Sequence, residues 1–441
     1  MRALVYGLAV AGVSTVRALQ RRGWDVVVAD DTVTAGRTEQ AAALGVELLD
    51  APDARMLQTV LDGCELLCPA PGIPEDHRVI RVASTSGIEI VSEIELAYRW
   101  EQQRPAGPRP MLAVTGTDGK TTTTLMAVAM LRAAGLSTVD AGNTETPLVD
   151  AIEADHDAFV VECTSFRLAW TQHFRAEAAA WLNLAPDHLN WHASMETYEA
   201  AKARIWAAQR PGDTALGFTG APDVMRRLAD APGRQLTFGH GGDYHADGGQ
   251  LLGPSGPIVP IAAMRRSLPH DITNALAASA MAIETDLADH AAIAEALASF
   301  TGPAHRLEHL GELDGVQWYN DSKATTPHAA AVAIHAFDDI VLIAGGQDKN
   351  VDLAEMAVER DRVRAVLAIG ETRDAVAAAF DGVDTVETTE FLPAAVERAA
   401  ELARPGATLL LSPGCASLDQ YRSFEARGDH FRELARHQGV R

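Results

Sequence analysis

The segment TGTDGKTTT, residues 115–123, carries the residue types that bind a nucleoside triphosphate. It follows the apolar run PMLAVT and precedes the helical pattern TTTLMAVAMLRAAG. Its glycines would let backbone N–H groups converge on phosphate oxygens at a helix N-terminus. Lys120 would reach the β- and γ-phosphates, and the Thr121 hydroxyl would hold Mg²⁺. Val114 stands where the G-x-x-x-x-G-K-S/T pattern has its first glycine, so a threonine-capped glycine turn is the alternative.

Three later positions could bring further ligands to a metal. Glu162 ends the apolar run in VVECTSF, and a buried carboxylate is costly unless it is paired or bound to a metal. His188, in PDHLNWH, is interpreted as a metal or substrate ligand, and His192 as a surface residue, since no H-E-x-x-H pattern joins them. From the residues alone, Lys202 in YEAAKARIW is an ordinary solvated helix position.

Polar clusters also follow the strand patterns of the last third of the chain. WYNDSKATTPHA holds hydroxyls, an acid and a lysine, which suit either a phosphate-and-metal contact or a helix cap. IAGGQDKN places Lys349 at a strand end. LSPGCASLDQYRSFEARGDHF offers Ser412, Ser417 and a helix N-terminus, which favours a carboxylate.

The N-terminal pattern GLAVAG, residues 7–12, is an imperfect dinucleotide fingerprint. Ala9 replaces the glycine that lets the backbone approach a pyrophosphate, and Asp30 stands at the ribose-reading distance. A nicotinamide-dependent dehydrogenase would leave the lysine-bearing loop unexplained.

The elements that position these residues alternate between strand and helix. Such alternation predicts an α/β fold with mostly parallel sheets, whose ligands lie at the carboxyl ends of strands. We expect three domains, at 1–103, 104–302 and 303–441, with a linker in EQQRPAGPRP, residues 101–110. GIEIVSEIEL is interpreted as strand, and residues 211–260 as short strands and turns.

Composition narrows the class of protein. A net charge of −23 over 441 residues argues against nucleic acid as a partner. Four scattered cysteines predict no disulfide framework, and Cys64 and Cys68 are expected as buried thiols. No apolar run reaches the ~20 residues of a membrane span, and the N-terminus predicts strand–turn–helix rather than a signal peptide. We therefore expect a cytoplasmic enzyme.

Eight motifs then carry a resemblance to the Mur ligases, over essentially the whole chain and in the order of that family. They are TGTDGKTTT, ECTSF, LNLAPDHLNWH, YEAAKARIW, GPAHRLE, YNDSKATT, GGQDK and LSPGCASLDQYRSFEARGDHF. The last four resemble the members that add D-glutamate. The phosphate loop of this family is the shorter G-T-x-G-K-S/T, in which Gly116 is in register and Val114 need not be glycine.

The resemblance implies a fold and an activity. The fold would be a Rossmann-like UDP-sugar domain, a central P-loop ATPase-type α/β domain with a small β-sheet, and a Rossmann-like C-terminal domain that binds an amino acid. The activity would be ATP-dependent amide formation in peptidoglycan precursor synthesis. The carboxylate of UDP-N-acetylmuramoyl-L-alanine would become an acyl phosphate, which the amine of D-glutamate attacks. We expect two Mg²⁺ sites and a monomer.

The resemblance also implies roles for individual residues. Lys202 would be carbamylated by CO₂, which turns a cation into a carboxylate-like metal ligand. The catalytic set would be Lys120, Glu162, His188, Lys202 and Lys323, and the metal ligands Thr121, Glu162, His188 and Lys202. ATP would contact Gly116, Thr117, Gly119, Lys120, Thr121, Thr122, Asn274, Arg306, Asp321 and Lys323. The other substrates would contact Gly72, Asn143, Thr164, Thr325, Lys349, Ser417, Leu418 and Phe424.

Several residues depart from the pattern of the family, among them Ala70, which replaces a serine, and the pair Asp31-Thr32. Asp118 stands for the usual asparagine, Glu145 for glycine and Arg167 for glutamine. Asp118 and Glu145 keep open a non-catalytic sensor of nucleotide or UDP-sugar. Another Mur or folylpolyglutamate-type ligase is the nearer alternative, although Lys349 and the Ser417 loop suit a dicarboxylate acceptor.

Overall fold

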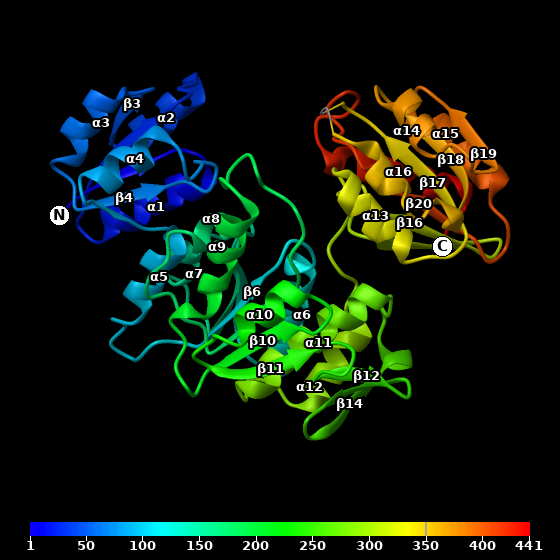
Figure 1. Cartoon of the computed structure of the whole chain (residues 1–441), viewed down its shortest axis with the longest axis horizontal. Coiled ribbons are helices and arrows are strands. Elements are labelled where there is room, and N and C mark those ends of the chain that lie inside the picture. Colours follow the sequence, from blue (N-terminus) through cyan, green and yellow to red (C-terminus); the bar gives the residue numbers. More distant parts are fainter. Residues whose placement is uncertain (349–350) are drawn as a thin grey trace. The chain divides into compact units, whose positions relative to one another are not determined.

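The computed structural model describes residues 1–348 and 351–441, so Lys349 lies outside the described residues. The chain forms two compact units, Met1–Phe300 and Thr301–Arg441 (Figure 1). Both contain sheets built mainly of parallel strands, which confirms the expected α/β class. The finer division at 103/104 and 302/303 stays a prediction.

The first sheet of the first unit has five parallel strands in the order β3-β2-β1-β4-β5. Its strands are β1 (Arg2–Tyr6), β2 (Asp25–Asp30), β3 (Glu47–Asp50), β4 (Leu66–Pro69) and β5 (Glu89–Ile90). Its helices are α1 (Val10–Arg21), α2 (Ala35–Leu44), α3 (Ala54–Leu61), α4 (Arg78–Thr85) and α5 (Glu93–Glu101).

The strand expected in GIEIVSEIEL is wrong beyond β5. The segment becomes helix α5, because Ile94, Ala97 and Tyr98 follow helical spacing and all three are buried. The predicted linker after α5 is fixed in place by Arg109. Its guanidinium donates to both carboxylate oxygens of Glu101 and to the carbonyls of Ile152 and Ala154. The linker thus ties the first sheet to the second.

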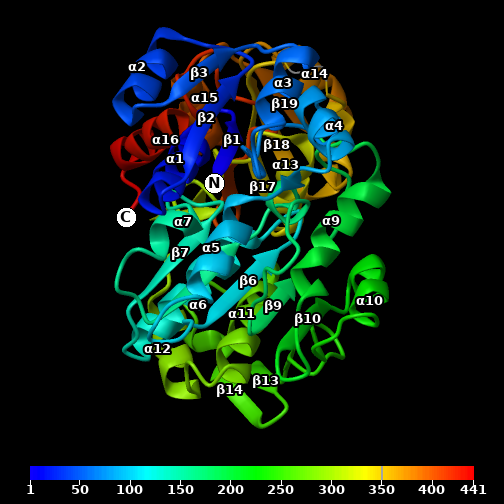
Figure 2. The ribbon, with the colours of Figure 1, turned by 90° about the vertical axis from the view of Figure 1, so that its left-hand side faces the viewer.

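The second sheet has six parallel strands in the order β11-β10-β9-β6-β8-β7, with β6, β9 and β10 side by side (Figure 2). Its strands are β6 (Met111–Thr115), β7 (Thr138–Gly142), β8 (Ala158–Glu162), β9 (Ala178–Trp181), β10 (Thr214–Phe218) and β11 (Arg234–Phe238). Its helices are α6 (Lys120–Ala133), α7 (Leu148–Ala151), α8 (Ser165–Leu168), α9 (Met195–Ala207), α10 (Pro222–Leu228), α11 (Pro269–Glu284) and α12 (His290–Ser299).

A small antiparallel sheet follows within residues 211–260. It comprises β12 (His245–Asp247), β13 (Gln250–Gly253) and β14 (Gly256–Pro260), and the 3-10 turn Ile261–Ala263 closes it. The expected short strands and turns are confirmed there, but the helix α10 was not predicted.

The second unit holds a six-stranded sheet in the order β15-β16-β20-β17-β18-β19, in which only the β15–β16 pair is antiparallel. Its strands are β15 (Glu308–Leu313), β16 (Val316–Asn320), β17 (Ile340–Gly345), β18 (Val363–Ile369), β19 (Thr385–Thr388) and β20 (Thr408–Leu411). Its helices are α13 (Pro327–His335), α14 (Arg373–Ala379), α15 (Leu392–Leu402) and α16 (Phe424–Gln438), with 3-10 turns at Leu353–Ala357 and Arg360–Arg362. Because β20 lies between β16 and β17, the loops that follow these three strands converge at one edge.

The cysteines agree with the expectation of buried thiols. All four cysteines are buried and free, and burial raises the pKa of the Cys68 thiol to about 12. Throughout residues 1–348 and 351–441, no helix is long and apolar enough to cross a membrane.

Candidate active site

The predicted phosphate loop connects β6 to α6. Gly119 precedes the helix with a φ of 81°, a backbone conformation that favours glycine. A Cβ added there would lie 2.7 Å from Oδ1 of Asn274, on helix α11. The Asn274 side chain therefore lies directly against the loop, and a larger residue at position 119 would require it to shift.

Asn183, which the sequence analysis missed, gives the loop its shape. Its Oδ1 accepts hydrogen bonds from the backbone N–H groups of Thr117 (2.8 Å) and Asp118 (2.9 Å). The Thr117 hydroxyl lies 3.1 Å from the hydroxyl of Tyr198. The only signal for Asn183 was its position in the loop directly after the β9 strand pattern, where ligand contacts gather in such sheets.

Two lysines donate to the same carbonyl of this loop. The Lys120 ammonium donates to the Gly116 carbonyl at 2.9 Å, and Lys202 donates to it at 2.6 Å. Lys202 is 1% exposed, so its interpretation as a solvated helix position is wrong. The buried face of α9 carries it toward the loop together with Tyr198 and Ile205.

The environment of Lys202 favours its neutral amine. Burial lowers the pKa of Lys202 well below its ordinary value, and the charge of Lys120 lowers it further. The carboxylates of Asp187 and Asp118 act in the opposite direction. A neutral amine is the form that can add CO₂, so the carbamate expected at this residue suits its surroundings.

Glu162 lies across from the start of the loop, because β8 pairs with β6 so that Glu162 faces Val114. The residue is 2% exposed. Its Oε1 accepts a hydrogen bond of 2.7 Å from Nδ2 of Asn143, whereas its buried Oε2 has no hydrogen-bond partner. A buried carboxylate oxygen without a donor calls for an explanation, and Mg²⁺ binds through one or two such oxygens. Glu162 thus fits the expected metal site.

The two histidines after β9 differ in their surroundings. His188 has a φ of 55° and lies against the Phe166 ring, with 4.6 Å between ring centroids. Its Nε2 is 3.2 Å from Oδ2 of Asp187, and burial lowers the pKa of its imidazole. A neutral imidazole is the form that ligates metals.

His192, expected at the surface, is 1% exposed, and that expectation is wrong. Its Nδ1 lies 3.0 Å from Oε2 of Glu75, and its Nε2 lies 2.9 Å from the Ser165 hydroxyl. Trp191 and Phe166 pack around it, so the loop that carries His188 folds inward over α8.

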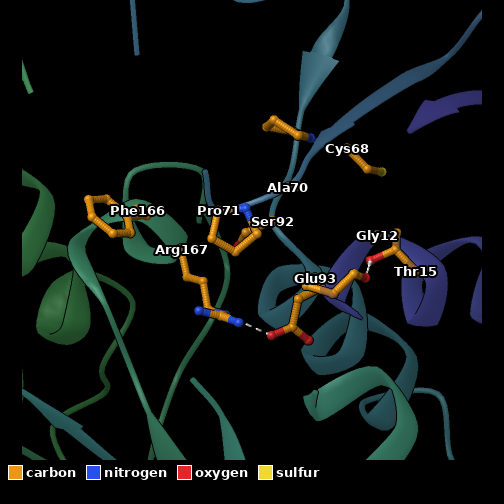
Figure 3. A pocket seen from close by; sticks show the side chains of 11 residues that line it. Gly12, Thr15, Cys68, Ala70, Pro71, Ser92, Glu93, Phe166 and Arg167 are labelled. Carbon is orange, nitrogen blue, oxygen red and sulfur yellow. Dashed lines mark hydrogen bonds and ion pairs between the residues drawn. The ribbon is translucent and has the colours of Figure 1, made fainter. Parts of the chain in front are cut away.

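A buried ion pair holds the side chain of Asn143 in place. The Arg167 guanidinium donates to Glu93 Oε1 at 3.0 Å and to Asn143 Oδ1 at 2.9 Å. Figure 3 shows Arg167 pointing toward Glu93 at a narrow cavity of about 10 Å³. The Asn143 amide then donates to Glu162, so a continuous chain runs from Glu93 to the candidate metal ligand. Thr164 accepts a hydrogen bond from the N–H group of Arg167 and caps α8.

The expected metal ligands are not a cluster of acids and histidines. Within the described ranges, no three His, Cys, Asp or Glu side chains converge on a common point. The expected set instead includes the Thr121 hydroxyl and Lys202, and the latter would become a ligand only as a carbamate.

Asp30, the residue expected to read a ribose if GLAVAG bound a dinucleotide, is engaged in contacts within the protein. Asp30 is 5% exposed, and its carboxylate accepts hydrogen bonds from the N–H groups of Leu8 (2.8 Å) and Thr32 (3.0 Å) and from Arg37. Asp30 therefore fixes the glycine turn. Gly72, an expected substrate contact, is exposed in the loop after β4.

The remaining predicted residues lie in the second unit, around the loops after β16 and β20. Asp321 accepts hydrogen bonds from the Ser412 hydroxyl (2.8 Å) and the Leu307 N–H group (3.1 Å). The Lys323 ammonium lies 3.7 Å from the centroid of the Phe424 ring. Ser417 is buried and Leu418 is 61% exposed, whereas Arg306 and Thr325 are partly exposed. Lys349 falls outside the described residues.

Comparisons with known proteins cover both units. Residues 1–92 match the Mur ligase MurD-like N-terminal domain, residues 114–282 the Mur ligase middle domain, and residues 305–415 the Mur ligase glutamate ligase domain. A UDP-N-acetylmuramoylalanine–D-glutamate ligase of Frankia casuarinae is 40% identical over 98% of this chain and 93% of its own. A ligase of the same name from Shouchella clausii is 38% identical over 98% of this chain and 95% of its own.

Solved structures share the fold. A UDP-N-acetylmuramate–alanine ligase from Thermotoga maritima aligns with a TM-score of 0.58 and 17% identity, over 99% of this chain and 100% of its own. A pseudomurein peptide ligase type C from Methanothermus fervidus aligns with a TM-score of 0.59 and 15% identity, over 99% of each chain.

Proposed function

The chain belongs to the Mur ligase family, and we propose that, as an ATP-dependent ligase of that family, it joins D-glutamate to UDP-N-acetylmuramoyl-L-alanine. The observation that carries this proposal is the similarity to D-glutamate ligases over 98% of the chain at 38–40% identity. A phosphate loop that is shaped by Asn183 and contacted by two lysines supports it. We assign UDP-sugar binding to residues 1–103, ATP binding to 104–302 and D-glutamate binding to 303–441.

The reaction must first make an unreactive acid reactive. A carboxylate is a poor electrophile without a leaving group. The carboxylate oxygen of UDP-N-acetylmuramoyl-L-alanine would therefore attack the γ-phosphorus of ATP, and the bond to the ADP oxygen would break. The D-glutamate amine would then attack the acyl carbon, and phosphate would leave as the nitrogen loses a proton. Both steps develop negative charge, which fixed cationic groups stabilise.

Residues of the first unit would serve the first step. Lys120 and the N–H groups of the loop would bind the triphosphate, and Asn274 would contact the nucleotide from α11. Thr121, Glu162, His188 and a carbamylated Lys202 would hold Mg²⁺, which screens charge between the two reacting anions when it is bound. Burial lowers the pKa of the His188 imidazole, which favours the neutral form that binds metals, and Glu162 keeps one carboxylate oxygen without a donor.

Residues of the second unit would serve the second step. The loops after β16 and β20 would present Thr325, Ser417, Leu418 and Phe424 to the D-glutamate, with Lys349 as the expected partner of a glutamate carboxylate. Asp321, Lys323 and Arg306 would contact ATP. We further propose that the protein acts in the cytoplasm as a monomer.

A phosphate-release assay tests this function. The full chain is supplied with ATP, Mg²⁺ and UDP-N-acetylmuramoyl-L-alanine, and with a panel of amino acids that includes D-glutamate, L-glutamate, L-alanine and a diamino acid. We expect release to be fastest with D-glutamate and to vanish in the Lys120→Met variant, which controls for contaminating ATPases. Faster release with another amino acid would contradict the assigned acceptor. Tight nucleotide binding without release would support a sensor instead.

A further inference from the structure

Arg427 is a buried guanidinium at the edge where the loops of the second unit converge. It lies in the first turns of α16 and is 1% exposed. Its Nε donates to the Ser322 hydroxyl at 3.0 Å, and its Nη2 donates to the Ser322 carbonyl at 2.9 Å. Its Nη2 also donates to the carbonyl of Cys415 at 3.1 Å, and its Nη1 to that of Ala416 at 3.3 Å. One side chain therefore joins the loop after β16 to the loop after β20.

The same group approaches the loop after β17. A Cβ added at Gly346 would lie 3.1 Å from Nη1 of Arg427. The guanidinium is thus placed among the loops of three neighbouring parallel strands. Ligands of open α/β sheets bind at such a position, where the strand order reverses.

The partners of the Arg427 guanidinium differ from those of the other buried arginines in this chain. Three arginines are buried among the described residues, namely Arg109, Arg167 and Arg427. Arg109 pairs with Glu101 at 2.7 Å and Arg167 pairs with Glu93 at 3.0 Å. The hydrogen-bond partners of Arg427 in the described chain are carbonyls and a hydroxyl, and the carboxylate that affects its charge most, Asp419, does so without a hydrogen bond.

This buried charge therefore has no direct counter-ion among the described residues. Burial lowers the pKa of Arg427 to about 10, and the more distant carboxylates of Asp419 and Asp321 only partly offset this effect. The N-terminus of α16 adds the positive end of a helix dipole. A buried cation without a nearby anion is unfavourable, and a bound carboxylate would relieve that cost.

We propose that Arg427 makes this edge of the second unit selective for an acidic amino acid, because it fixes the loops after β16 and β20 and supplies their positive potential. This inference rests on the proposed function, in which these loops bind D-glutamate. Arg427 is fully buried and touches the loops rather than the ligand, so it is a positioning residue. The potential that it creates distinguishes D-glutamate from its neutral isostere D-glutamine.

The test compares kcat and KM of the full chain for D-glutamate and D-glutamine, with saturating ATP, Mg²⁺ and UDP-substrate. In Arg427→Met, the KM for D-glutamate should rise about tenfold or more, and the preference for D-glutamate over D-glutamine should fall by a similar factor. The KM for ATP should change less than about twofold. Arg427→Lys keeps the charge but loses the planar fork, so its preference should stay closer to that of the unaltered protein.

Arg432→Met is the matched control on the same helix. Arg432 pairs with Glu308 at 2.9 Å, so its removal should leave the preference for D-glutamate unchanged. If Arg427→Met does not fold, Ser322→Ala removes the hydroxyl that accepts from Nε and donates to the carbonyl of Phe424. The KM for D-glutamate should then rise about threefold.

Two results would overturn the inference. One is a folded Arg427→Met protein with reduced melting temperature but unchanged preference, which would show a merely structural role. The other is Ser322→Ala with an unchanged KM when Arg427→Met does not fold. Failure of the unaltered protein to use D-glutamate would instead contradict the proposed function, before any variant is compared.

Discussion

Replacement of Arg167 by methionine should destabilise the first unit strongly, because it leaves Glu93 buried without its cation. The Glu93 side chain is 3% exposed, and after the change it would keep the Val149 N–H group, at 3.3 Å, as a hydrogen-bond donor. Removal of one partner from a buried ion pair costs about 3–5 kcal/mol. We expect a loss of that size in the free energy of unfolding at pH 8.

The loss should depend on pH in a defined direction. Burial raises the pKa of the Glu93 carboxyl, and Arg167 opposes that shift. Without Arg167 the raised pKa persists, so the folded protein holds the Glu93 proton more tightly than the unfolded chain. The variant should therefore approach the stability of the unaltered protein below the ordinary carboxyl pKa, and lose stability as the pH rises through the raised pKa. Arg167→Met combined with Glu93→Gln should recover about 2 kcal/mol at pH 8.

Urea unfolding at pH 5 and pH 8, followed by circular dichroism, measures these differences. Arg226→Met is the control, because that arginine pairs with Asp223 and Glu199 at the surface and its loss should leave stability nearly unchanged. A loss below about 0.5 kcal/mol for Arg167→Met at pH 8 would refute the electrostatic account. A double variant no more stable than the single one would refute it equally.

Four further predictions concern the phosphate loop and its metal. Lys202→Ala should abolish amide formation with unchanged circular dichroism, and added acetate should partly restore it; full activity without acetate would exclude an essential carbamate. Activity of the unaltered protein should fall in CO₂-depleted buffer and as the pH drops toward the lowered pKa of Lys202, because the protonated amine cannot add CO₂. Glu162→Gln should weaken Mn²⁺ binding about tenfold by electron paramagnetic resonance, whereas exposed Glu145→Gln should not. Gly119→Ala should prevent ATP binding in calorimetry, because the added Cβ would meet Asn274 at 2.7 Å; normal affinity would contradict the close approach of α11 to the loop.

Much of the fold could be predicted from the alternation of strand and helix patterns and from the residue types in the loops between them. Apolar runs with glycine-bearing loops located β6, β17, β18 and β20, and the loop chemistry placed Lys120 at the start of a helix. Prediction from the sequence failed where one pattern of apolar residues is compatible with both a strand and a helix. GIEIVSEIEL is compatible with an alternating strand and with the buried face of α5. In the structure α5 packs against α7, and Ile94, Leu96 and Ala97 belong to an apolar cluster that includes residues of both sheets.

The errors at the site have a common physical origin. Which face of a helix packs inward depends on partners that are distant in the sequence. The helix α9 is rich in alanine, so nothing local indicates that Lys202 points at the phosphate loop. His192 is buried because Glu75 and Ser165 reach it from other elements. Asn183 lies within the motif LNLAPDHLNWH, but the motif does not indicate that its side-chain oxygen faces the phosphate loop.

The shared carbonyl of Gly116 links nucleotide binding to the chemistry of Lys202. Two ammonium groups at one acceptor repel each other, and burial together with the charge of Lys120 lowers the pKa of Lys202. A carbamate on that amine would place a negative charge beside Lys120, so repulsion between the two side chains would become attraction. The proposed carbamate would therefore be stabilised by the same lysine that lowers the pKa of Lys202. Lys202 comes to lie beside Lys120 only when α9 folds against the loop. For this reason the sequence around the lysine does not indicate its role.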